Sequence, residues 1–172
     1  MIRLVNCNIN RYRSILSMSM NISSELNLIA ICGQNNVGKT NTLRAINLFF
    51  HPETYDAEID MPKIKRATGG QSTHPKIELT FYDDKRNKYF TVTRNFQKYS
   101  ELSPNESLTG FMFETHGKQK QNKQKLTASE IVSLLEKIEF VYIESINVFI
   151  PELIEKITEG IIDVEYDKSR FS

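Results

Sequence analysis

The feature that most constrains how this chain folds is the octapeptide at residues 33–40, Gly-Gln-Asn-Asn-Val-Gly-Lys-Thr. It matches the pattern G-x-x-x-x-G-K-[ST], in which a glycine-framed loop joins a strand to a helix. Gly33 and Gly38 allow backbone angles that a Cβ would obstruct, so that successive N–H groups converge on an anion. The motif therefore predicts a phosphate-binding loop that opens a helix.

The segments on both sides of the loop have the patterns that the motif requires. Residues 26–32 form an almost continuous apolar run, which is typical of a central strand covered on both faces. From Lys39 the pattern becomes helical, and His51 and Pro52 end it. The positions at helical spacing are Leu43, Ile46, Asn47 and Phe50. We therefore expect a buried strand, the loop and an amphipathic helix in this order.

The chemistry of the loop residues indicates ATP and Mg²⁺ as ligands. A helix N-terminus carries a partial positive charge, and Lys39 adds a mobile full charge for the β- and γ-phosphates. The Thr40 hydroxyl is the expected ligand of Mg²⁺. The alternative is a glycine turn that happens to precede Lys-Thr. The predicted nucleotide-binding residues are Gly33, Gln34, Asn35, Asn36, Val37, Gly38, Lys39, Thr40 and Asn41, and Lys39 is also a predicted catalytic residue.

Strand patterns occupy much of the remaining chain. Two strands are expected before the loop, at residues 2–9 and 16–22, with a turn at 11–15. Residues 77–96 predict an antiparallel hairpin that turns at 83–87, and 108–114 predict another strand. A further strand is expected at 140–146. The expected fold is thus α/β, with a mixed sheet and an antiparallel hairpin subdomain.

Three other segments have distinct patterns. The run 118–125 is low in complexity and basic, which favours a solvated loop, with contact to a DNA backbone as the second interpretation. Thr127 and Glu130 have the spacing of a capping box, which predicts a helix through Ile138. Another helix is expected from Pro151. The connection at residues 52–75 is long enough to have a function of its own.

Length and composition fit one globular domain. The chain has 172 residues, 40% of them hydrophobic, and a formal net charge of +1, so that any basic surface must arise from local clustering. Cys7 and Cys32 lie in apolar runs and are expected to be buried thiols. There is no signal-peptide pattern and no apolar stretch of the ~20 residues that span a bilayer. The sequence favours a cytoplasmic protein without a membrane span.

The order of motifs resembles a known group of ATPases. Asn-Asn-Val-Gly-Lys-Thr-Asn-x-Leu-x-Ala-Ile, beginning at Asn35, is similar to the ABC-type ATPases of the RecF, SMC and OLD group. The element Asn-Arg-Tyr-Arg-Ser-Ile at residues 10–15 also resembles an Asn-Phe-Arg-Ser-like element of that group. The resemblance implies a P-loop NTPase fold of ABC type. It also implies that Arg13 approaches the phosphates or braces the loop, and that Asn36 faces the γ-phosphate across a dimer.

The catalytic elements of ABC ATPases are not evident. No Leu-Ser-Gly-Gly signature is found, and the best candidate for the Walker B carboxylate is Glu144, at the end of the apolar run 140–143. An ordinary strand is the alternative interpretation of that run. We therefore expect residues 1–172 to be the N-terminal nucleotide-binding lobe of a longer chain, and leave open whether this chain hydrolyses ATP.

Three functions fit these observations. The first is an ATPase module that dimerises with ATP and controls DNA binding or an associated nuclease, in phage defence or DNA repair. The second is a nucleotide-gated regulatory or DNA-tethering module with little hydrolysis of its own. The third is a small-molecule kinase, for which residues 63–66 make a poor arginine-rich lid. The family resemblance favours them in this order.

Overall fold

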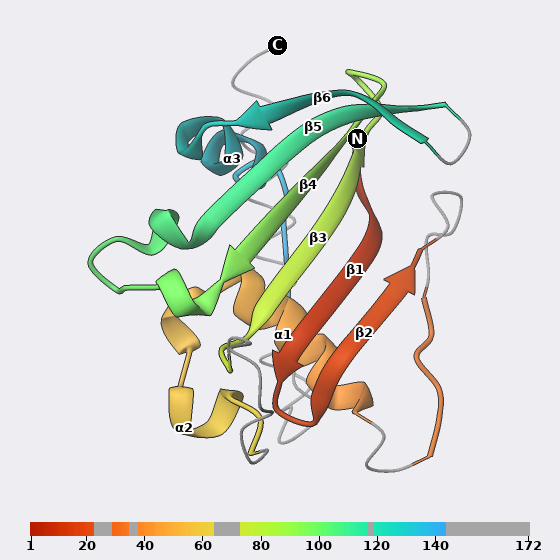
Figure 1. Cartoon of the computed structure of the whole chain (residues 1–172). Helices are drawn as coiled ribbons and strands as arrows, with labels where there is room; N and C mark the ends of the chain where they lie inside the picture. Colours follow the sequence, from red (N-terminus) through yellow and green to blue (C-terminus); the bar gives the residue numbers. More distant parts are fainter. Residues whose placement is uncertain (23–28, 35–37, 64–72, 117–118, 144–172) are drawn as a thin grey trace, which may run out of the picture. The chain divides into compact units, whose positions relative to one another are not determined.

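The computed structural model describes residues 1–22, 29–34, 38–63, 73–116 and 119–143. The chain divides into two compact units, Met1–Glu139 and Phe140–Ser172. The first unit is built on a six-stranded sheet (Figure 1). Of the second unit, only the irregular segment 140–143 belongs to the described residues, so the strand expected at 140–146 is absent from its described part. The helix expected from Pro151 lies outside the described residues.

The sheet is antiparallel at every pairing. Its strands in spatial order are β2 (Ile15–Asn21), β1 (Ile2–Tyr12), β3 (Lys76–Asp83), β4 (Lys88–Asn95), β5 (Leu108–His116) and β6 (Gln119–Leu126). The predicted hairpin is β3–β4. Long-range pairing of β1 with β3 places the N-terminal hairpin beside this second hairpin. The strands predicted at 2–9, 16–22 and 108–114 are confirmed.

One face of the sheet carries the core. Alternate residues of β3 and β4, such as Leu79 and its partner Val92, are fully buried on this inner face. The same alternation places Phe81 opposite Phe90, with ring centroids 5.1 Å apart. Because side chains of a strand alternate between two faces, these four apolar side chains all lie on the inner face.

Two helices cover the inner face (Figure 1). Helix α1 (Lys39–Phe50) receives a hydrogen bond of 2.9 Å from Arg94 Nε of β4 to the Phe49 carbonyl. Helix α3 (Ala128–Leu135) packs Ile131 on Gly110 of β5, where an added Cβ would lie 3.0 Å from the Ile131 side chain. Arg94 and Gly110 share the inner face because Gly110 pairs with Val92, two residues before Arg94. The predicted capping box of Thr127 and Glu130 is confirmed at the start of α3.

The buried side of α1 differs from the expected one. Its buried residues are Thr42, Ala45, Ile46, Leu48 and Phe49, whereas Leu43 is 47% exposed. A period of 3.6 residues fixes the width of an apolar stripe but not which of two adjacent stripes meets the sheet. The small side chain of Ala45 is fully buried, so it sets the face that approaches the strands.

Short elements complete the unit. They are η1 (Pro52–Thr54), α2 (Ala57–Asp60), η2 (Phe96–Lys98) and η3 (Pro104–Ser107). The long polar connection after α1 therefore contains two helical turns before the range 64–72, which lies outside the described residues. None of the helices in the described residues has both the length and the apolar character needed to cross a membrane.

Three expectations are wrong. The basic run expected as a solvated loop forms strand β6, because an edge strand needs hydrogen-bond partners from β5 but no buried face. Residues 29–32 form no strand, since none of the described strands pairs with them. Cys32 in this segment is consequently exposed, while Cys7 of β1 is buried as expected and its burial raises the pKa of the thiol to about 12.

Candidate functional site

The phosphate-loop motif ends at the N-terminus of α1, in a geometry that fits an anion. Gly38 precedes the helix with φ 94° and ψ 8°, a left-handed conformation that side-chain-bearing residues rarely adopt. No side chain caps this helix end, and its first turn contains no acidic residue. The first N–H groups of a helix have no intrahelical acceptors, so they remain available to a phosphate oxygen.

Lys39 places a cation on the same loop. Its ammonium donates to the carbonyl oxygens of Gly33 at 2.7 Å and Gln34 at 2.5 Å, so the side chain folds back from the helix to the start of the loop. Carbonyl oxygens neutralise an ammonium only in part, and a phosphate is the stronger partner. The loop therefore fits the phosphate chain of a nucleotide. It combines an uncapped helix N-terminus, Gly38 in a left-handed conformation and the ammonium of Lys39.

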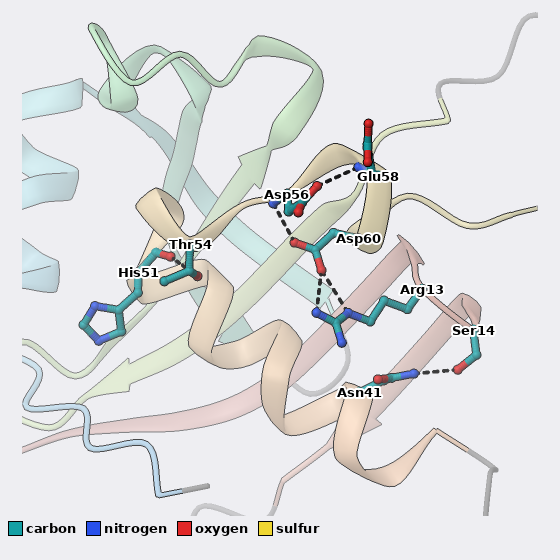
Figure 2. Close-up of polar contacts among 8 residues, drawn as sticks. All are labelled: Arg13, Ser14, Asn41, His51, Thr54, Asp56, Glu58 and Asp60. Atoms are coloured by element: carbon teal, nitrogen blue, oxygen red, sulfur yellow. Dashed lines mark hydrogen bonds and ion pairs between the residues drawn. The ribbon is translucent and has the colours of Figure 1, made fainter.

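The β1–β2 turn packs against this helix end (Figure 2). Asn41 Nδ2 donates to Ser14 Oγ at 2.8 Å, and a Cβ added to Gly38 would lie 3.6 Å from Ser14 Oγ and from Ile15. The turn consists of Arg13 and Ser14, between the paired residues Tyr12 and Ile15. It therefore positions the first turn of α1 from the side of the sheet.

Arg13 is held by Asp60 of α2 (Figure 2). Its Nε and one terminal nitrogen lie 2.9 Å from Asp60 Oδ1, and its backbone N donates to the Asp60 carbonyl at 2.9 Å. Arg13 has φ 49°, an uncommon angle for a residue other than glycine. These three contacts offset the strain of the turn and join β1, β2 and α2 beside the loop.

Both oxygens of the Asp60 carboxylate accept hydrogen bonds. It is 2% exposed and also accepts a hydrogen bond from the backbone N of Asp56 at 3.1 Å and another from the Tyr12 side chain. Burial, together with this carboxylate, raises the pKa of Tyr12 above its ordinary value. Asp60 thus supplies the counter-charge for Arg13, so the Arg13 guanidinium is committed within the protein.

The opposite end of α1 is fixed by Arg94. Besides its bond to Phe49, the guanidinium donates to Ser107 Oγ at 3.1 Å and to the Pro104 carbonyl at 3.2 Å. Burial lowers the pKa of Arg94 to about 10, so it remains a cation at neutral pH. A cation at a helix C-terminus is electrostatically favourable, and this one ties α1 to β4.

A hollow of about 610 Å³ adjoins the helix end. It is lined by Arg13, Ser14, Leu16, Asn41, Ile59, Met61 and Lys63. Leu16 and Ile59 are about half exposed there, at 50% and 54%. The lining combines cations with apolar side chains in one open space, and its volume lies in the range of small-molecule sites.

The structure brings part of the predicted site together. Gly33, Gln34, Gly38 and Lys39 share the loop, and Thr40 is exposed in the first helical turn. Asn35, Asn36, Val37 and Glu144 lie outside the described residues. Sequence reasoning missed Asp60, because an aspartate in a polar connection gives no sign of burial. The one available signal was the helix cap of Asp56, whose side chain accepts from Glu58 N at 2.8 Å.

Comparison with known proteins agrees with this geometry. A family model described as "AAA ATPase domain" matches residues 2–170. The chain belongs to this family. Membership in the AAA ATPase domain family implies ATP binding, and it accounts for the phosphate-binding loop on α1. No curated protein matches the chain with significance.

A solved structure gives the fold of this AAA ATPase domain. It is described by the words "Structural biochemistry of ATP-driven dimerization and DNA stimulated activation of SMC ATPases" and aligns with a TM-score of 0.53 at 15% identity. The alignment covers 91% of this chain and 98% of the other. At this identity the likeness concerns the fold. The chain therefore shares the fold of an SMC ATPase structure, as its motif order predicts.

Proposed function

We propose that the chain binds ATP with Mg²⁺ at residues 33–41 and uses this binding to control self-association. The observation that carries the proposal is the Lys39 ammonium, held at 2.7 Å from the Gly33 carbonyl beside an uncapped helix N-terminus. In this proposal Lys39 leaves the loop carbonyls for the β- and γ-phosphates, while the first N–H groups of α1 bind phosphate oxygens. The Thr40 hydroxyl holds Mg²⁺, which supplies charge neutralisation between the phosphates.

The hollow beside Asn41 is the proposed place of the nucleoside. Its apolar walls suit a base, and Lys63 adds a cation at its edge. Arg13 and Ser14 keep the wall rigid through their bonds to Asp60 and Asn41. Arg13 therefore braces the site and leaves the phosphates to Lys39.

The test of this site is isothermal titration calorimetry with ATP and Mg²⁺. We expect Lys39→Ala to weaken binding at least about tenfold, because the loop loses its full charge. Lys85→Ala removes the same charge from the exposed β3–β4 turn and should bind ATP like the wild type. Equal ATP affinity of Lys39→Ala and the wild type would refute the site.

We further propose that ATP joins two copies of the chain, and that association controls DNA binding or an associated nuclease. The support is the family, and the fold it shares with an SMC ATPase structure described for ATP-driven dimerization. An OLD-type role in phage defence or DNA repair, within the cytoplasm, fits such a module. By the resemblance, Asn36 reaches the γ-phosphate of the second copy.

A regulatory or DNA-tethering module with little hydrolysis is the second candidate. It is favoured by the sequence, in which no Leu-Ser-Gly-Gly signature is found and Glu144 is the best candidate for the Walker B carboxylate. In either role we expect the lysines of β6 to contact DNA. Lys120, Lys123 and Lys125 are exposed there, while Lys118 lies outside the described residues. Such contacts weaken steeply with salt.

A further inference from the structure

The face of the sheet opposite α1 and α3, here called the outer face, carries a continuous row of aromatic rings. Tyr82 of β3 pairs with Tyr89 of β4, and Tyr89 pairs with Phe113 of β5. Their ring centroids are 4.8 Å and 5.7 Å apart, and the Tyr89 and Phe113 rings are nearly parallel, with 15° between their planes. The row therefore crosses three adjacent strands at one level.

Cations stand at both ends of this row. The Arg3 guanidinium of β1 lies 5.7 Å from the centre of the Tyr82 ring, and Lys120 Nζ of β6 lies 4.6 Å from the centre of the Phe113 ring. One step along the same face, Lys123 Nζ lies 4.0 Å from the centre of the Phe111 ring. Two cations thus flank the three rings, and the whole row extends over five strands of the outer face.

Strand alternation explains why these residues meet on the face opposite α1 and α3. Tyr82 follows Phe81, which is buried on the inner face, and Tyr89 precedes the inner-face residue Phe90. The two longest described helices, α1 and α3, both pack on the inner face. Tyr82, Tyr89 and Phe111 are consequently half-buried, with part of each side chain open on the outer face.

The β6 side of this face has uncompensated positive charge. Lys120, Lys123 and Lys125 are exposed, and none of them forms an ion pair with a residue in the described part of the chain. By contrast Lys88 lies 3.1 Å from Glu114, and Arg3 is bonded to Asp84. Within the row, Tyr89 is the half-buried ring over which no described cation lies. An anionic ligand with flat apolar groups fits this combination.

We propose that the outer face binds single-stranded DNA, with a base stacked on Tyr89 and phosphates on Lys120 and Lys123. Unstacked bases offer their π-faces to aromatic side chains, whereas in a duplex these faces are covered by neighbouring base pairs. This inference rests on the DNA-binding part of the proposed function and narrows it to single strands. It also accounts for the pairing of each lysine with a ring, since a phosphate draws the lysine aside and opens the ring for a base.

The test measures binding of a fluorescein-labelled DNA of about 15 nucleotides, and of the matching duplex, by fluorescence anisotropy. We expect the wild-type chain to favour the single strand. Tyr89→Leu should weaken single-strand binding about tenfold, because one stacked base contributes roughly 1–3 kcal/mol. Tyr89→Phe keeps the ring and should retain the affinity. Tyr99→Leu makes the same change beyond η2 and serves as the control.

The salt dependence of binding distinguishes the phosphate contacts of the lysines from the stacking of a base on Tyr89. Lys123→Gln should lower the slope of log affinity against log salt by about 0.7, the value for one phosphate contact on a single strand. Tyr89→Leu should leave this slope unchanged, as should the charge control Lys98→Gln in η2. Wild-type affinity of Tyr89→Leu for the single strand, or equal binding of duplex and single strand, would overturn the proposal. A dimer of the chain that binds neither the single strand nor the duplex would also overturn the proposal.

The two levels of the proposal are distinguished by calorimetry with ATP on the same preparations. If Tyr89→Leu and Lys123→Gln bind ATP normally and the single strand is not bound by the wild type, the outer-face inference is wrong and the ATP site stands. If the wild type fails to bind ATP but binds the single strand through Tyr89, the proposed function is wrong and the outer-face site stands.

Discussion

At the scale of single residues, Asp60 explains how a strained turn is kept beside the phosphate loop. A buried carboxylate is stable only when its charge is paired and its oxygens are hydrogen-bonded. Asp60 meets both conditions with Arg13 at 2.9 Å and the Asp56 backbone N at 3.1 Å. The same contacts hold Arg13 at a positive φ, so charge pairing and backbone geometry depend on each other.

Replacing Asp60 by asparagine should therefore destabilise the fold. The amide keeps the shape but leaves the Arg13 cation, 26% exposed, without its counter-charge. We expect a loss on the order of 2 kcal/mol in the free energy of unfolding, below the full cost of a broken buried pair because Arg13 is partly solvated. Urea denaturation followed by circular dichroism measures it. Glu58→Gln, an exposed carboxylate of the same helix, should change stability by less than about 0.5 kcal/mol.

At the scale of elements, α3 shows a helix start that local chemistry determines. Thr127 Oγ1 accepts from Glu130 N at 3.4 Å, and the Glu130 side chain accepts from Thr127 N at 2.8 Å. The bond from Thr127 N, and after it a second bond of 2.8 Å from Thr127 Oγ1 to the same carboxylate, lower the pKa of Glu130 below its usual value. Ile131 and Leu134 follow and bury the helix on the sheet.

Thr127→Ala should cost about 1 kcal/mol of stability, since one N-terminal N–H loses its side-chain acceptor. Thr127→Ser retains the hydroxyl and should stay close to the wild type. The folded pKa of Glu130 is depressed, so its contribution is present above its unfolded pKa and declines as the pH falls through the folded value. The difference between Thr127→Ala and wild type in urea denaturation should accordingly shrink at acid pH. A constant difference would show that the bond from Thr127 Oγ1 to the Glu130 carboxylate does not contribute to it.

The elements also show what the sequence can determine. The capping box, the β3–β4 hairpin and α1 were predictable because turn chemistry, period-2 alternation and helical spacing are local signals. Strand β6 was not, because an edge strand paired only with β5 carries no apolar alternation. The Arg13–Asp60 pair joins residues 47 apart, and the buried stripe of α1 depends on contacts with strands that are also distant in the sequence, such as that of Phe49 with Arg94. No local pattern encodes either of them. The aromatic row of the outer face depends on register in the same way.

At the scale of the whole molecule, ATP binding and ATP hydrolysis are separate expectations. Binding needs the loop and α1, whereas hydrolysis needs a carboxylate to orient water, for which Glu144 is the candidate. We expect the purified chain to turn over well below the ~1–10³ s⁻¹ typical of enzymes. A phosphate-release assay measures it. Turnover in the enzymatic range that is abolished by Glu144→Gln would identify Glu144 as the catalytic carboxylate and contradict slow hydrolysis.

Self-association is the second expectation at this scale. If two copies enclose ATP, the nucleotide binds the associated form more tightly than the monomer. This difference in ATP affinity sets how far the equilibrium shifts toward the associated form. Coupling of this kind typically amounts to about 5–150-fold, and it is reciprocal, so ATP affinity should rise with protein concentration. Light scattering with and without ATP measures the mass, and calorimetry at two protein concentrations measures the reciprocal effect. Lys39→Ala should lose both ATP binding and association, whereas Asn36→Ala should retain ATP binding but associate less. A chain that remains monomeric when saturated with ATP would leave the nucleotide site intact and rule out ATP-driven dimerisation.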